Sequence, residues 1–243
     1  LDKHVVGQAK AKRAVAIAKR VTPEVKYHPL SARRAIYAAW TLARPEDLAV
    51  VTSIANDPAI DFRVRRDAFL ALLDWNIPPT PDPVTAFVHP LPANRTALTG
   101  ATAEMLEPYF DAAATDERAS KLLPWALKLT KQEKLPVSKE HLASYLTNQE
   151  TPEEARLLAL DLLAARQKAT DQWKKTLEAL SSDKSDKIRS QAREILLRLN
   201  PDAKALALFA QTLDNEKSSI TEKQLTLQTL GKLTGPEAAK IIK

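Results

Sequence analysis

The sequence predicts an all-α fold, an α-solenoid of about six helix pairs with one proline-rich insertion. Ala, Leu, Lys, Glu and Arg dominate the 243 residues and glycine occurs only 4 times, so intrinsic preferences favour helix almost throughout. Apolar residues recur at the spacing of one helix face. Similar segments also return along the chain at intervals typical of a helix-pair repeat. We therefore expect a single domain over residues 1–243, in which each unit contacts its neighbours.

Two segments carry the repeat pattern most clearly, residues 48–73 and residues 177–199. In the first, Val64, Ala68 and Leu72 lie at i, i+4 and i+8, which makes one apolar stripe on a helix. The second segment has the same stripe, formed by Ile188, Ala192 and Leu196. Each segment also has an aspartate where we expect a helix N-terminus, and these are Asp61 and Asp186.

Weaker copies of the pattern lie at residues 31–42, 116–129, 152–165 and 220–233. The cations that align across all six copies are Arg33, Arg65, Arg118, Arg156, Arg189 and Lys223. Their steps are 32, 53, 38, 33 and 34 residues, and four of these fit a helix-pair repeat. The order Asp, Val or Ile, Arg, Ala resembles that of HEAT repeats. The resemblance implies about six HEAT-like helix pairs, with the long step marking an insertion.

Predicted helix starts recur as a proline followed by an acidic residue, as in Pro45-Glu46 and Pro152-Glu153. Proline at the first helical position gives up an amide that has no partner there, and the acid favours the positive end of the helix. Thr151 and Glu154 have the spacing of a capping box.

The insertion spans residues 75–100 and contains six prolines, at positions 78, 79, 81, 83, 90 and 92. They exclude helix and favour an extended or turn-rich segment. Its apolar residues, Trp75, Ile77, Val84, Phe87, Val88 and Leu91, could hold it against the helices. The favoured interpretation is an Ω-type loop packed by its own apolar side chains. The alternative is a strap that contacts a partner through Trp75 and Phe87.

The charge is concentrated at one end of the chain. The first 20 residues contain six of the basic residues and only Asp2 as an acid, so they account for most of the net charge of +6. We expect residues 1–20 to form a basic N-terminal helix or cap. The rest is nearly neutral, so nucleic acid is not an expected partner. No apolar run is long enough to span a membrane. The chain begins at Leu1 without a signal peptide, and we expect it to be a fragment of a longer protein.

The sequence offers no pattern for chemistry. Cysteine is absent, and the four histidines, His4, His28, His89 and His141, lie far apart without the spacing of a metal site. We expect His141 to be a surface or helix-capping residue. No serine lies in a Gly-x-Ser-x-Gly elbow. We therefore expect no catalytic, cofactor-binding or metal-binding residues, and the chain is not expected to be an enzyme.

Residues 70–111 resemble part of the HEAT region of large exported proteins of planctomycete and verrucomicrobial bacteria. The matching residues are Leu72, Trp75, Pro78, Pro79, Asp82, Val84, Thr85, Pro90, Leu91, Pro92 and Arg95. In that family the HEAT region follows a sugar-dehydrogenase-like β-propeller and precedes a c-type cytochrome domain. The resemblance implies an extracytoplasmic location. The resemblance does not imply redox chemistry for this chain, because the chain lacks a Cys-x-x-Cys-His haem site.

Residues 1–18 resemble the N-terminal segment of protease-associated unfoldase ATPases of the HslU and ClpX kind, in which the counterpart of Val6-Gly7-Gln8 lies beside the nucleotide base. ATP hydrolysis requires a glycine-rich phosphate loop that ends in Gly-Lys-Ser or Gly-Lys-Thr. None of the 4 glycines begins such a loop, so ATPase activity is excluded.

These observations predict a monomeric, noncatalytic scaffold that binds a protein partner or a neighbouring domain, or an interdomain spacer. Candidate partner contacts are Arg33, Arg65, Arg156, Arg189, Trp75 and Phe87. For the arginines, internal salt bridges and hydrogen bonds to loops are the favoured alternative. A DNA-binding protein of the HEAT-like alkylpurine glycosylase type is the second functional hypothesis. It would use Arg65, Arg66, Asp74 and Trp75, and the near-neutral repeats argue against it.

Overall fold

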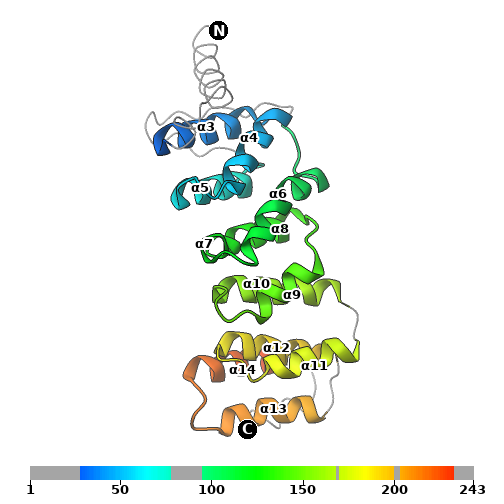
Figure 1. Cartoon of the computed structure of the whole chain (residues 1–243). Coiled ribbons are helices and arrows are strands. Elements are labelled where there is room, and N and C mark those ends of the chain that lie inside the picture. Colours follow the sequence, from blue (N-terminus) through cyan, green and yellow to red (C-terminus); the bar gives the residue numbers. More distant parts are fainter. Residues whose placement is uncertain (1–27, 78–94, 168–169, 200–202, 233–243) are drawn as a thin grey trace. The chain divides into compact units, whose positions relative to one another are not determined.

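The computed structural model describes residues 28–77, 95–167, 170–199 and 203–232, which form 12 helices and no strand (Figure 1). The predicted all-α class is thus confirmed for these residues. The basic segment 1–20 and most of the insertion, including Phe87, lie outside them. None of the described helices combines the length and the apolar character needed to cross a bilayer.

The helices divide into two compact units. Unit 1 is Leu1–Ser144 with Asn148–Pro152, and unit 2 is Tyr145–Thr147 with Glu153–Lys243. Unit 1 contains α3 (Pro29–Leu42), α4 (Pro45–Asn56), α5 (Phe62–Leu73), α6 (Gly100–Ala113), α7 (Glu117–Ser120), α8 (Leu123–Glu133) and most of α9 (Lys139–Thr147). Helix α5 packs on α3, α4 and α8, whereas α6 packs on α4 and α7. Unit 1 therefore contains two rows of helices, with α3, α5 and α8 in one row and α4 and α6 in the other.

Unit 2 contains the last residues of α9 and five further helices, α10 (Glu153–Arg166), α11 (Asp171–Leu180), α12 (Asp186–Leu199), α13 (Ala203–Asp214) and α14 (Ile220–Gly231). Helix α12 is central, because it contacts α10, α11, α13 and α14. A buried apolar cluster lies where α12, α13 and α14 meet, and it consists of Leu197, Phe209 and Leu230.

The apolar stripes predicted from the sequence are buried. Val64, Ala68 and Leu72 are inaccessible to solvent in α5, and Ile188, Ala192 and Leu196 are buried in α12. Asp61 is the N-cap of α5 and accepts a hydrogen bond from the backbone amide of Arg63 at 2.9 Å, as predicted. Asp186 is the first residue of α12, and its side chain pairs with Arg189.

The prolines also begin helices as predicted where the structure describes them. Pro45 is the first residue of α4, and α10 begins directly after Pro152. Residues 116–129, which resemble one helical copy in sequence, divide into α7 and α8. Pro124 lies in the first turn of α8, where its missing amide costs nothing, so the chain turns and a new helix begins.

Among the described residues, one turn occurs three times at the entry to a helix. The side chains of Asp57, Asn148 and Asn215 each accept a hydrogen bond from the amide two residues later, at 3.0, 3.0 and 2.9 Å. Their backbone carbonyls each accept from the amide three residues later, at 3.2, 3.2 and 3.1 Å. Asp and Asn suit this position because their short side chains can bond to the backbone of the following residues. The turns at Asp57, Asn148 and Asn215 are followed by α5, α10 and α14, respectively.

Candidate functional site

The repeated turns place a cation eight residues later, and these cations are Arg65, Arg156 and Lys223. The Nε atom of Arg65 donates to the carbonyl of Ala55 at 2.9 Å, and that of Arg156 donates to the carbonyl of Leu146 at 3.0 Å. Each carbonyl belongs to the penultimate residue of the preceding helix, α4 or α9. Carbonyls in the last turn of a helix have no hydrogen-bond donor within that helix, and the two arginines therefore supply one to α4 and one to α9.

Both arginines are buried, each with a relative exposure of 3%. Burial lowers the pKa of Arg65, whose guanidinium carbon lies 5.9 Å from the ring centre of Tyr109. Arg156 lies in unit 2 and makes a two-pronged ion pair with Asp183, at 3.1 Å from Nη1 and 2.5 Å from Nη2. Both partners of this pair are buried, so each charge depends on the other for compensation.

Arg33 and Trp75 occupy different surroundings in unit 1. Arg33 is exposed, and its Nε lies 2.8 Å from the Asp67 carboxylate on α5. Trp75 is inaccessible to solvent, and its indole N–H donates to the carbonyl of Thr96 at 2.7 Å. The guanidinium carbon of Arg95 lies 5.5 Å from the Trp75 ring centre and 5.7 Å from that of Trp40. Trp75 thus ties residues 95–96 to the end of α5.

Arg189 belongs to a polar cluster inside unit 2. The carboxylate of Glu222 on α14 accepts from Arg189 Nε at 2.9 Å and Nη2 at 2.6 Å, and from Arg193 Nη1 at 2.8 Å. Arg193 also donates to the Thr212 hydroxyl at 2.7 Å and to the Ser181 carbonyl at 2.9 Å. The cluster therefore joins helices α11, α12, α13 and α14. Sequence reasoning aligned Arg189 with the other repeat cations, but its acidic partner lies 33 residues away in α14.

Glu222 is held ionised by this cluster. Its hydrogen bonds to Arg189 lower its pKa, against an opposing effect of burial, and the charges of both arginines add to the lowering. The same interaction raises the pKa of Arg189. The positive charges of Arg189 and Arg193 are thus balanced within the protein by the negative charges of Glu222 and Asp186.

This arrangement predicts that the stability of unit 2 falls in acid. Because the folded pKa of Glu222 is depressed, the unfolded chain takes up its proton first, at about pH 4.3. The stabilisation is complete above that pH and is lost as the pH falls further through the folded pKa. We expect Glu222→Gln to destabilise the protein by about 1.5–3 kcal/mol at pH 7. Urea denaturation at successive pH values should also give a shallower acid slope for the variant, and an unchanged slope would contradict this assignment.

The cluster lines a groove of about 630 Å³ in unit 2. The lining also contains the apolar side chains of Leu196 and Leu208. Lysines at positions 174 and 217, the carboxylate of Glu178 and several amide and hydroxyl side chains line the rest. In all, four basic and two acidic residues line it. A volume of this size fits a peptide segment or a small molecule.

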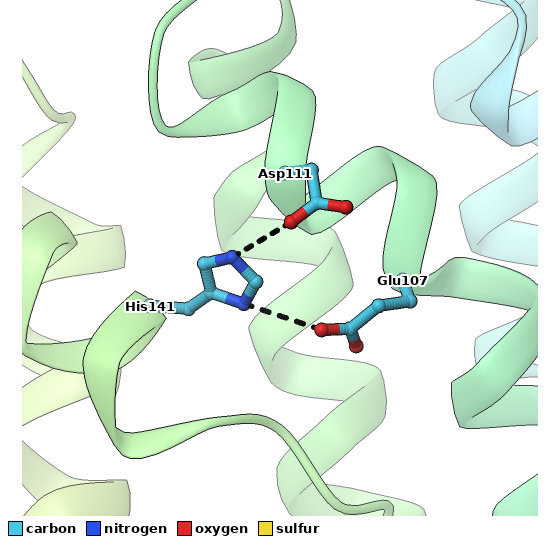
Figure 2. Close-up of side chains that lie close together, drawn as sticks. All are labelled: Glu107, Asp111 and His141. Atoms are coloured by element: carbon cyan, nitrogen blue, oxygen red, sulfur yellow. Dashed lines mark hydrogen bonds and ion pairs between the residues drawn. The ribbon is translucent and has the colours of Figure 1, made fainter.

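A second cluster, Glu107, Asp111 and His141, lies in unit 1 (Figure 2). Glu107 and Asp111 are one turn apart on α6, and His141 lies in the first turn of α9. Asp111 Oδ1 lies 3.1 Å from the imidazole Nε2, and Glu107 Oε1 lies 3.6 Å from Nδ1. Sequence reasoning placed His141 alone near a helix start. It missed the cluster, because only the four-residue spacing of the two acids is visible in the sequence.

A scan against protein-family models, a search of curated proteins and a search of solved structures each gave no match to this chain.

Proposed function

We propose that this chain is a noncatalytic binding scaffold of HEAT-like helix pairs, and that the groove of unit 2 receives an acidic segment of a protein partner or a neighbouring domain. The observation that carries the functional part of this proposal is the groove itself. It has room for a peptide, and its lining includes Leu196, Leu208 and the lysines at positions 174 and 217.

The HEAT-like repeat is supported by the recurring turn at Asp57, Asn148 and Asn215, with a cation eight residues after each. Contacts between alternate helices also recur at nearly constant spacing. Arg33 bonds to Asp67, Lys187 to Glu153, and Arg189 to Glu222, with separations of 34, 34 and 33 residues. A repeat protein with nearest-neighbour packing has this regularity.

The two lysines are the groove cations best placed to meet an acidic ligand. The other two basic residues of the groove, Arg189 and Arg193, already donate to Glu222. Lys174 is only partly buried and Lys217 is exposed. A ligand with carboxylates spaced to meet both lysines, and with an apolar side chain for Leu196 and Leu208, would complement the groove.

Fluorescence anisotropy of a fluorescein-labelled peptide of alternating Glu and Ala tests the proposal. We expect saturable binding, weakened at least about tenfold by the double variant Lys174→Glu/Lys217→Glu. The matched control is Lys121→Glu/Lys139→Glu, which makes the same change of charge at exposed positions of unit 1 and should bind like the parent. Equal weakening in both variants, or no binding by the parent, would count against the groove.

Labelled duplex DNA, titrated in the same way, tests the glycosylase hypothesis. Salt-sensitive binding to DNA, in preference to the acidic peptide, would favour that hypothesis. No specific observation favours it at present, because Arg65 and Trp75, two of the residues it requires, are buried.

A further inference from the structure

We propose that Glu107, Asp111 and His141 form a binding site for a divalent transition metal ion, with Zn²⁺ as the best match. The site lies in unit 1 and is independent of the groove in unit 2. It would join the middle of α6 to the start of α9 (Figure 2).

The three side chains are already close enough for small movements to complete a site. One potential ligand atom from each residue lies within 4.8 Å of the other two. Zn²⁺ binds His nitrogen and carboxylate oxygen at about 2.0–2.2 Å, so neighbouring ligand atoms of a tetrahedral site are about 3.4 Å apart. Contraction by about 1.4 Å at most is therefore needed. Rotation about side-chain bonds can supply it without moving the helices.

The histidine is the fixed member of the set. Its backbone amide donates to the hydroxyl of Ser138, the N-cap of α9, at 3.0 Å, and its side chain is only 17% exposed. The carboxylates of Glu107 and Asp111 are 47% and 68% exposed, so they are free to rotate. In the structure they approach different ring nitrogens. Metal binding at Nε2, where Asp111 already lies, requires the longer Glu107 side chain to swing from Nδ1 to the same side.

The donor set selects the class of ion. One imidazole and two carboxylates suit zinc and its neighbours among the first-row transition metals, whereas Mg²⁺ and Ca²⁺ prefer oxygen ligands alone. Three protein ligands on a solvent-facing surface leave a further position to water, which is the usual arrangement for a zinc ion with an open coordination position.

Isothermal titration calorimetry of the full chain with Zn²⁺, after removal of metal with EDTA, tests the site. We expect one Zn²⁺ bound per chain. The affinity for Zn²⁺ should fall at least about tenfold in His141→Ala and in Asp111→Asn. His28→Ala is the matched control, because it removes another described histidine in unit 1 that lies outside the cluster, and it should leave the affinity unchanged. At a free Zn²⁺ concentration a hundred times Kd, the melting temperature of the parent should rise by about 5–10 °C.

Glu107→Gln and Asp111→Asn preserve side-chain volume, so they keep the test valid if His141→Ala fails to fold. Co²⁺ gives a second readout, because ligation by His141 should produce visible absorption bands that these variants lose. Absence of stoichiometric binding by the parent, or equal affinity in the parent and the His141→Ala and Asp111→Asn variants, would overturn the proposal. The cluster would then be a polar contact between α6 and α9 only.

Discussion

Replacing Arg156 with Met should destabilise the folded protein by about 3–5 kcal/mol. The change leaves the buried Asp183 carboxylate without its counterion and removes the donor to the Leu146 carbonyl. Methionine fills much of the same volume, so the loss reports mainly on charge and hydrogen bonding and not on a cavity. Urea denaturation followed by circular dichroism at pH 7 would measure the change in the free energy of unfolding.

Two further variants test whether burial of the ion pair explains the large loss of stability expected for Arg156→Met. Arg33→Met removes an ion pair of similar length from an exposed position, and we expect a loss of no more than about 1 kcal/mol. The double variant Arg156→Met/Asp183→Leu removes both buried charges and should be more stable than Arg156→Met alone. If Arg33→Met and Arg156→Met had equal effects, the buried pair would not have the role assigned to it.

Trp75→Ala should cost about 3–5 kcal/mol of stability, the range found when a large buried aromatic side chain is deleted. Trp75 is inaccessible to solvent, donates to the Thr96 carbonyl and stacks against the Arg95 guanidinium. All three contributions disappear with the indole ring. Thermal and urea denaturation would show the loss as a lower midpoint.

Trp75→Phe separates the packing contribution from the hydrogen bond. It keeps an aromatic ring but leaves the Thr96 carbonyl without its donor, so we expect a smaller cost of about 1–3 kcal/mol. Ile77→Ala is the control, because Ile77 is close in sequence and half exposed, and its cost should stay within about 0.5 kcal/mol. A cost for Ile77→Ala as large as that for Trp75→Ala would show that the segment, and not the indole ring, sets the stability.

Local features of this fold could be predicted from the sequence because their causes are local. The spacing of Val64, Ala68 and Leu72 fixes which face of α5 is buried, and Asp61 marks where that helix begins. Pro45 similarly marks the start of α4. In each case the residues that decide the outcome lie within two or three turns of one another.

The candidate sites could not be predicted in the same way, because they depend on which helices lie side by side. Nothing in the sequence around His141 points to Glu107 or Asp111, which come from α6. Glu222 resembles an ordinary acid in the first turn of a helix until α12 places two arginines against it. The repeated turn is hidden for another reason, since Asp57 corresponds to Asn148 and Asn215, and only the cations that follow the turn, Arg65, Arg156 and Lys223, align in the sequence.

The bonds from Arg65 to Ala55 and from Arg156 to Leu146 each close a loop of only ten residues. Loops of this length form in about 10–100 ns, and their closure costs little chain entropy. These two contacts can therefore form before distant parts of the chain meet. A single molecule pulled from its two ends should then keep these two contacts until late, because each can close again faster than contacts between distant residues.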